Sequence, residues 1–214
     1  MSADAVGGVG GVVLAAGGGS RFGKGGHKLL APFRGRPLVA WALEAALCAD
    51  LDAVVVVSGA TPIDDLVREV AGGTAVVVAN EGWASGQASS LRTGIDWCAR
   101  HGLGAAVVGV ADQPLVGAAA WRAVAAATHA PVVTATFDGR RRPPVRLDRS
   151  VWPMLGAEGD EGARALMRQR PDLVGEVACE GDPADVDTPE DLRRLEALAA
   201  TGKSGRPRSH DHDR

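Results

Sequence analysis

A glycine-rich loop that carries several cations follows the first apolar run of the chain, in the stretch LAAGGGSRFGKGGHKLL at residues 14–30. Bare backbone amides and fixed positive charges in one loop favour an anionic ligand. The cations here are Arg21, Lys24 and Lys28, which a simple glycine-rich connector would not require. The loop therefore predicts a site for a nucleotide or another phosphorylated molecule.

Two familiar phosphate loops match this stretch poorly. The dinucleotide fingerprint GxGxxG would need glycine where Phe22 stands, so a nicotinamide site is disfavoured. The P-loop pattern GxxxxGK is satisfied at residues 18–24, but Gly25 replaces the hydroxyl residue that would hold magnesium. We interpret that match as accidental. The remaining interpretation is a loop that wraps a triphosphate in an extended conformation.

Carboxylates form a second set of candidate groups. Asp112 directly follows an apolar run at residues 105–110, and Pro114 forces a turn just beyond it. Mg²⁺ usually takes one or two carboxylates together with substrate phosphates. In the later segment DVDTPEDL, Asp187 is the preferred companion of Asp112. Asp185 is the alternate ligand, because residues two apart share a face in an extended segment.

The elements that must position these groups alternate along the chain. Short Val-rich runs predict strands covered on both faces at residues 11–15, 53–58, 74–79 and 105–110. Patterns of helical length lie at residues 37–49, 61–71 and 89–100. This α/β alternation predicts a single doubly wound, mostly parallel sheet with helices on both faces. Such sheets bind ligands beyond the carboxyl ends of their strands.

Local signals set the boundaries of this domain. Thr61 and Thr188 each begin a helix-capping pattern with a proline and a third-position aspartate. Residues 131–178 are expected to face the substrate, with residues 140–144 breaking any central strand and a short helix at residues 162–170. We predict one ligand-binding domain at residues 11–200, a flexible N-terminus at 1–10 and a disordered tail at 201–214.

Composition narrows the classes of partner and compartment. The 214 residues are 46% hydrophobic with a net charge of -3, and 23 basic against 26 acidic residues disfavour nucleic acid as the main partner. No apolar run approaches the about 20 residues that span a bilayer, so no membrane partner is expected. Cys48, Cys98 and Cys179 show no zinc or redox spacing and are interpreted as buried thiols. We expect a cytoplasmic protein.

The glycine loop resembles the LAAGxSxRMGxxK signature of the MobA-like NTP transferases, and within them the molybdenum cofactor cytidylyltransferases. Four further segments follow in the family's order: NEGWASGQASSL from Asn80, VADQPLV from Val110, GDEGARALM from Gly159 and DVDTPEDL from Asp185. Together the five cover residues 12–195. The resemblance implies a Rossmann-like nucleotidyltransferase fold and Mg-dependent transfer of a nucleotidyl group from an NTP to a phosphorylated acceptor, with release of pyrophosphate.

The resemblance also implies residue roles. The glycine loop would wrap the triphosphate, the segment at Asn80 would contact the base, and aspartates of the third and fifth segments would hold Mg²⁺. The implied catalytic residues are Arg21, Lys28 and Asp112, and the implied metal ligands are Asp112 with Asp187 or, as the alternate, Asp185. The implied nucleotide contacts are Leu14, Ala15, Ala16, Gly17, Gly18, Gly19, Arg21, Lys24, Lys28, Asn80, Gly86, Ser89 and Asp112.

The choice of substrates rests on smaller features. Ala16 fits the cytidylyl branch, whereas Gly19 resembles the guanylyl branch, so CTP is favoured and GTP is possible. Arg140, Arg141 and Arg142 are candidates to hold a phosphorylated pterin-type acceptor, whose product a recipient molybdoenzyme would take. The alternatives are a guanylyltransferase, an enzyme acting on a sugar phosphate or phospholactate, and a carrier without chemistry.

Overall fold

The computed structural model describes residues 7–19, 22 and 26–200. Arg21 and Lys24 of the glycine loop lie outside the described residues, as do the tail at 201–214 and most of the stretch predicted to be flexible at the N-terminus. The first strand begins at Val9, so the last two residues of that stretch belong to the sheet. Residues 1–6 are not described.

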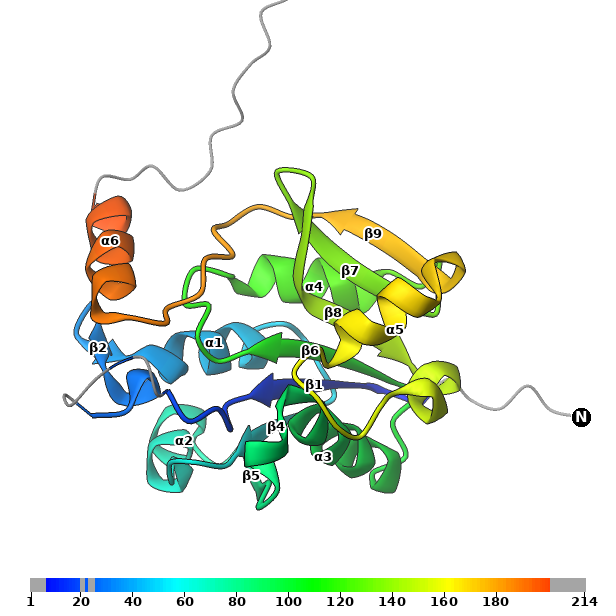
Figure 1. The fold of residues 1–214 in the computed structure, drawn as a ribbon, viewed down its shortest axis with the longest axis horizontal. Coiled ribbons are helices and arrows are strands. Elements are labelled where there is room, and N and C mark those ends of the chain that lie inside the picture. The colour runs from blue at the N-terminus through cyan, green and yellow to red at the C-terminus, as the bar shows by residue number, and fades with distance from the viewer. Residues whose placement is uncertain (1–6, 20–21, 23–25, 201–214) are drawn as a thin grey trace, which may run out of the picture.

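A seven-stranded sheet in the order β5-β4-β1-β6-β8-β7-β9 forms the centre of the molecule (Figure 1). β8 is antiparallel to both of its neighbours, and the remaining neighbouring pairs are parallel. The strands are β1 (Val9–Leu14), β4 (Ala53–Ser58), β5 (Ala75–Ala79), β6 (Ala105–Val110), β7 (Val132–Phe137), β8 (Arg140–Asp148) and β9 (Val174–Ala178). A separate ribbon pairs β2 (Pro32–Phe33) with β3 (Arg36–Pro37).

Helices cover both faces of this sheet. The strand residues alternate between two cores, since Val13 and Val56 belong to one and Val12 and Val57 to the other. The first core includes side chains of α1 (Leu38–Leu47), α2 (Asp64–Ala71), α4 (Ala118–Ala126) and α6 (Pro189–Ala200). The second includes α3 (Gln87–Arg100) and α5 (Ala163–Gln169). The doubly wound, mostly parallel α/β sheet is confirmed.

The order of the strands creates a switch point beside β1. From β1 the chain builds outward through β4 and β5, and it then crosses over to place β6 on the opposite side of β1. In open sheets of this kind, the crevice at the carboxyl ends of the two strands flanking that reversal receives the ligand. Here those ends are Leu14 of β1 and Val110 of β6, which are register partners. The candidate loop and the candidate carboxylates both begin at this edge.

The predicted break at residues 140–144 is wrong, because these residues are part of the internal strand β8. Thr134 of β7 pairs with Val145, while the next residue, Ala135, pairs with Arg142. The two prolines between those partners therefore lie in an irregularity of the ladder, where no backbone donor is needed. β6 pairs only with residues 145–148, so the proline segment has a single neighbouring strand.

Two local predictions have different outcomes at their helix starts. At α6, Thr188 Oγ1 accepts from the Asp191 backbone N at 3.1 Å and the Thr188 backbone N donates to Asp191 Oδ2 at 2.9 Å, which confirms the capping box. α2 begins at Asp64, and the residue at its N-cap position, Ile63, makes no capping hydrogen bond through its side chain. The predicted helix start at Thr61 is therefore wrong. Asp64 and Asp65 instead place negative charge in the first turn.

The cysteines differ in how far they are buried. Cys98 is buried, and burial raises the pKa of its thiol to about 12. Cys48 is exposed at the end of α1, so the interpretation of all three cysteines as buried thiols is wrong for this residue.

None of the helices in the described residues combines the length and apolar character needed to cross a membrane.

Candidate active site

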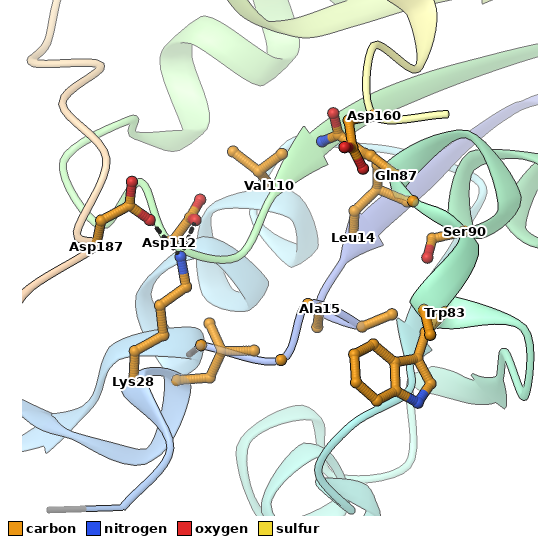
Figure 2. A pocket seen from close by; sticks show the side chains of 17 residues that line it. Leu14, Ala15, Lys28, Trp83, Gln87, Ser90, Val110, Asp112, Asp160 and Asp187 are labelled. Atoms are coloured by element: carbon orange, nitrogen blue, oxygen red, sulfur yellow. Dashed lines mark hydrogen bonds and ion pairs between the residues drawn. The ribbon is translucent and has the colours of Figure 1, made fainter. Parts of the chain in front are cut away.

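A cavity of about 480 Å³ opens at the carboxyl ends of β1 and β6 (Figure 2). Most of the residues predicted from the sequence to contact the nucleotide or the metal line it: Leu14, Ala15, Ala16, Gly17, Gly18, Gly19, Lys28, Gly86, Asp112 and Asp187. The wall also includes residues outside the predicted contact set, of which Trp83, Ala84, Gln87 and Ser90 belong to the segment expected to contact the base; the others are Leu29, Val110 and Asp160. The structure therefore brings segments from the whole length of the domain to one site.

Lys28 and two aspartates form an ionic cluster at one end of this cavity (Figure 2). Lys28 Nζ donates to Asp112 Oδ2 at 2.6 Å and to Asp187 Oδ1 at 2.9 Å. The Val186 backbone N donates to the Asp112 carbonyl at 2.9 Å, so the chain holds the two aspartates together independently of their side chains. The α6 capping box begins one residue after Asp187. Backbone contacts therefore hold the segments that carry Asp112 and Asp187 next to each other.

The glycine loop delivers Lys28 through a short helical turn, η2 (Lys28–Leu30). His27 precedes this turn, and its Nε2 lies 2.8 Å from the Gly17 carbonyl oxygen. That contact joins the two described ends of the loop across the residues between them. Gly19 has φ 58°, a left-handed conformation that suits glycine, next to the rings and stems of His27 and Lys28. The loop is thus tied back on itself beside the ionic cluster.

The described side chains of the ionic cluster carry one positive and two negative charges. Burial on its own would lower the pKa of Lys28, but the adjacent carboxylates of Asp112 and Asp187 outweigh it and raise that pKa above its ordinary value. The ammonium neutralises one of two negative charges. Asp112 Oδ1 is buried and has no hydrogen-bond partner among the residues that the structure describes. An unsatisfied carboxylate oxygen beside a second carboxylate suits a divalent cation.

The protein donors near this point are few. Within the described ranges, no group of three or more His, Cys, Asp or Glu side chains is arranged to hold a metal ion. Asp112 and Asp187 together would leave most positions of an octahedral Mg²⁺ to water and to phosphate oxygens. The donor set therefore fits a metal that binds together with a nucleotide, and it does not resemble a closed structural metal site.

Asp185, the alternate metal ligand, lies in a different setting. Its Oδ1 accepts a hydrogen bond from Gln113 Nε2 at 2.8 Å, and the same amide donates to the Pro183 carbonyl at 3.0 Å. Burial, followed by the charge of Asp112, raises the pKa of the Asp185 carboxyl. The side chain lines a second cavity of about 420 Å³, with Arg140 and Arg142 from the β7–β8 hairpin among the other lining residues.

The segment after β5 forms another part of the first cavity. Asn80 is buried, and its Nδ2 donates to Ser89 Oγ at 2.9 Å and to Ser90 Oγ at 3.0 Å, while its Oδ1 accepts from the Gly82 backbone N at 3.0 Å. The amide thus braces the turn internally. Neither Asn80 nor Ser89 is on the cavity wall, where Ser90 stands instead. Local sequence could not distinguish these roles, because the amide of Asn80 and the hydroxyls of Ser89 and Ser90 can each both donate and accept a hydrogen bond.

Trp83 closes the cavity on the side of the glycine loop. A methyl group added at Gly18 would lie 3.0 Å from the Trp83 ring carbon Cζ3, and one added at Gly59 would lie 2.8 Å from Trp83 Cβ. The indole therefore packs directly against bare backbone. It keeps 36% of its surface exposed, more than the other tryptophans of the chain. An exposed aromatic face in a nucleotide-sized cavity suits a nucleobase.

An open α/β sheet whose switch point gathers a glycine loop, a lysine and two carboxylates defines a protein that binds a nucleoside triphosphate. Residues 11–174 match the MobA-like NTP transferase domain. The chain belongs to this family and is a nucleotidyltransferase.

Two individual proteins are similar to most of the chain. The chain is 35% identical to nicotine blue oxidoreductase of Paenarthrobacter nicotinovorans over 197 residues, which are 86% of this chain and 95% of the relative. It is 28% identical to purine catabolism protein PucB of Bacillus subtilis (strain 168) over 193 residues, 85% of this chain and 92% of the relative.

Solved structures share the architecture. Rv0371c of Mycobacterium tuberculosis H37Rv has a TM-score of 0.75 at 30% identity, covering 90% of this chain and 100% of that one. A complex of Rv0371C with manganese has a TM-score of 0.68 at 29% identity, covering 89% of this chain and 98% of the other.

Proposed function

We propose that this chain is a Mg-dependent molybdenum cofactor cytidylyltransferase, which transfers CMP from CTP to a phosphorylated pterin and releases pyrophosphate. One observation carries the proposal: Lys28, Asp112 and Asp187 meet within 2.9 Å at the end of a cavity that the glycine loop lines. Cations and a carboxylate pair suit triphosphate with a divalent metal. A carrier without chemistry would have little use for that carboxylate pair.

The polarity of the cavity orients the nucleotide. The triphosphate would lie at the end with Lys28, along the backbone amides of residues 17–19, while the base would lie toward Trp83 and Ser90. Asp112 and Asp187 would hold the metal against the phosphates. When bound, Mg²⁺ would neutralise charge on the phosphate oxygens and help to align them for displacement. The structure of Rv0371C with manganese supports a divalent metal in this fold.

The reaction needs alignment more than proton transfer. A phosphate oxygen of the acceptor attacks the α-phosphorus of CTP, the bond to the β-phosphate breaks, and pyrophosphate leaves with that electron pair. A phosphate monoester has a second pKa of about 6, so the attacking oxygen is already largely ionised at neutral pH. Lys28 would hold the phosphates in line and stabilise charge as it develops.

The second cavity is the proposed acceptor site. Arg140 and Arg142 line it, and these side chains offer the fork of donors that matches a phosphate. Asp185 lies in the same wall and is two residues from Asp187, so an acceptor here would lie next to the triphosphate end of the first cavity. This placement would put both anionic reactants around one metal.

A matrix of donors and acceptors tests the proposal. CTP, GTP, ATP and UTP should each be combined with a molybdopterin-type acceptor, a sugar phosphate and phospholactate, with Mg²⁺ present and pyrophosphate measured. We expect the greatest release with CTP and the pterin. Release with GTP and the pterin would favour a guanylyltransferase, and release with another acceptor would overturn the pterin assignment. Binding of nucleotide without release in any combination would favour the carrier.

The name of one relative calls for an additional assay beside the matrix of donors and acceptors. The 35% identical protein is named an oxidoreductase, so NADH and NADPH oxidation with a quinone-type dye should be measured in parallel. The residues of the glycine loop do not form the dinucleotide fingerprint, which argues against a nicotinamide coenzyme. Dye-dependent oxidation of either coenzyme by the purified chain, abolished by Lys28→Ala, would make reduction the better assignment.

A further inference from the structure

Lys28 occupies the point on which two carboxylates converge. Its Nζ lies 2.6 Å from Asp112 Oδ2 and 2.9 Å from Asp187 Oδ1, so one ammonium nitrogen bridges both side chains. A Mg²⁺ ion bound by the same carboxylates would bring their oxygens to about 2.0–2.1 Å around one centre. The lysine and such an ion would thus compete for the same pair of oxygens.

Lys28 and Asp112 interact in a largely enclosed part of the site, which strengthens the competition between the lysine and a metal ion. The Lys28 side chain is 11% exposed and that of Asp112 is 21% exposed, so water screens their interaction weakly, whereas the Asp187 side chain is 43% exposed and is screened more. Two neighbouring carboxylates repel each other in such a setting unless a cation lies between them. Lys28 lies between the two carboxylates and offsets that repulsion. This role is additional to its proposed contact with phosphate.

We propose that Lys28 is the resident cation of the metal site in the nucleotide-free protein, and that it exchanges places with the divalent metal when an NTP binds. The triphosphate offers Lys28 new anionic partners in the adjoining glycine loop, which releases the carboxylates to the metal. Metal and nucleotide then bind with positive coupling, each raising the affinity for the other. This inference rests on the proposed use of an NTP and a divalent metal at this site.

The substitution Lys28→Met tests the first half of the exchange. Methionine is similar in length and carries no charge, so it removes the competitor while filling much of the same space. Binding of Mn²⁺ alone should be measured by the loss of the free-ion EPR signal, without nucleotide or acceptor. We expect the variant to bind Mn²⁺ at least about tenfold more tightly than the unmodified protein, because the Lys28 ammonium no longer competes for the two carboxylates. Equal or weaker binding would overturn the proposal.

Two matched variants control for charge and folding. Lys28→Arg keeps the positive charge and should leave Mn²⁺ affinity within about threefold of the starting value. Arg122→Met removes a positive charge from the exposed pair with Asp50 and should also change nothing. Thermal unfolding adds a second readout, because Mn²⁺ should raise the Tm of Lys28→Met more than that of either control. A general gain in Mn²⁺ affinity in all three variants would contradict a specific exchange.

The second half of the exchange, in which Lys28 moves to the triphosphate and the metal takes the carboxylates, is tested with a nucleotide that cannot be turned over. α,β-Methylene-CTP should tighten Mn²⁺ binding to the unmodified protein at least about tenfold and should tighten it less in Lys28→Met, where no lysine needs to move. Equal tightening in both would overturn the exchange. Tighter Mn²⁺ binding by Lys28→Met, together with no binding of the analogue by the unmodified protein, would leave the resident cation standing and instead contradict the use of CTP.

Discussion

The Asp160 carboxylate occupies the space that a side chain at residue 86 would need. Gly86 has φ 111°, and a methyl group built there would lie 2.6 Å from Asp160 Oδ1 and 2.5 Å from the Gly159 carbonyl oxygen. The Ala88 backbone N donates to that same carbonyl at 2.9 Å. Glycine is therefore required at residue 86 for the GDEG segment to dock on the base segment. The contact also places an acidic side chain in the cavity wall.

Asp160 is expected to accept a hydrogen bond from the nucleoside half of the NTP. It lies beside Gln87 and away from Lys28, where its carboxylate would repel a phosphate (Figure 2). Asp160→Ala should weaken CTP binding about tenfold, since hydrogen bonds to charged groups contribute about 1.5–3 kcal/mol. Calorimetry with CTP, 2′-deoxy-CTP and UTP would identify the donor, because the variant should lose discrimination against the analogue that lacks it.

Controls for this prediction lie in the same segment. Asp160→Asn keeps the shape that packs on Gly86 and should retain the melting temperature while weakening CTP binding. Glu161 pairs with Arg168 outside the cavity, so Glu161→Gln should bind CTP normally. Equal affinity of Asp160→Ala and the unmodified protein for CTP would show that the carboxylate serves only to dock the segment.

The two candidate metal ligands of the fifth segment should differ sharply. Asp187→Asn is expected to reduce Mg-dependent kcat at least about a hundredfold, as should Asp112→Ala, because each would remove a ligand that acts on transition-state charge. Asp185→Asn keeps an acceptor for Gln113 and should retain most of the turnover. Steady-state kinetics over a range of Mg²⁺ concentrations would decide between them. The reverse ranking would make Asp185 the ligand.

The part of this site that could be predicted from sequence is the part set by local pattern. Val-rich runs indicate strands that are covered on both faces, and a loop or carboxylate directly after such a run must lie at the carboxyl edge of the sheet. Leu14, Val110 and Asp112 were placed correctly on that basis. The pairing of Lys28 with Asp187 spans 159 residues and depends on how α6 returns to the sheet, so spacing alone could not give it.

Other features depend on contacts that sequence does not encode locally. The prolines of β8 suggested a break, yet an irregularity opposite Ala135 accommodates them inside the sheet. Asn80 has the chemistry of a base contact, but two serines of the following helix capture its amide. Asp160 was visible within a recognised segment, and its role as a wall residue emerges only when that segment packs against Gly86.

The two lysines of the glycine loop provide a test of register. If the loop follows the family pattern, Lys28→Ala should raise the KM for the triphosphate and lower kcat more than Lys24→Ala does, since Lys28 adjoins the carboxylate pair. Lys24 lies outside the described residues, so this ranking rests on Lys28 alone. Initial-rate kinetics with varied CTP would measure it. A larger defect in Lys24→Ala would favour the P-loop register instead.

The thiols should differ in reactivity by orders of magnitude. Burial raises the pKa of Cys98 to about 12, so this thiol stays protonated throughout the neutral range and is also inaccessible. Cys48 is exposed and should react first with a disulfide reagent at pH 8. Mass spectrometry after brief labelling would locate the modified residue. Labelling of Cys98 before Cys48 in native protein would show that the packing around α3 opens readily.

The choice of base is expected to depend partly on Ala16. This residue is 3% exposed, lines the cavity, and has its methyl group next to Gly59. A methyl group narrows the space beside the base, so CTP should have a higher kcat/KM than GTP. One methyl contributes only about 1–3 kcal/mol, and Ala16→Gly should therefore reduce the preference without inverting it. Competition between equimolar CTP and GTP, with both products quantified, would measure the ratio. Predominant guanylylation by the unmodified protein would refute the cytidylyl assignment and leave the nucleotidyltransferase class intact.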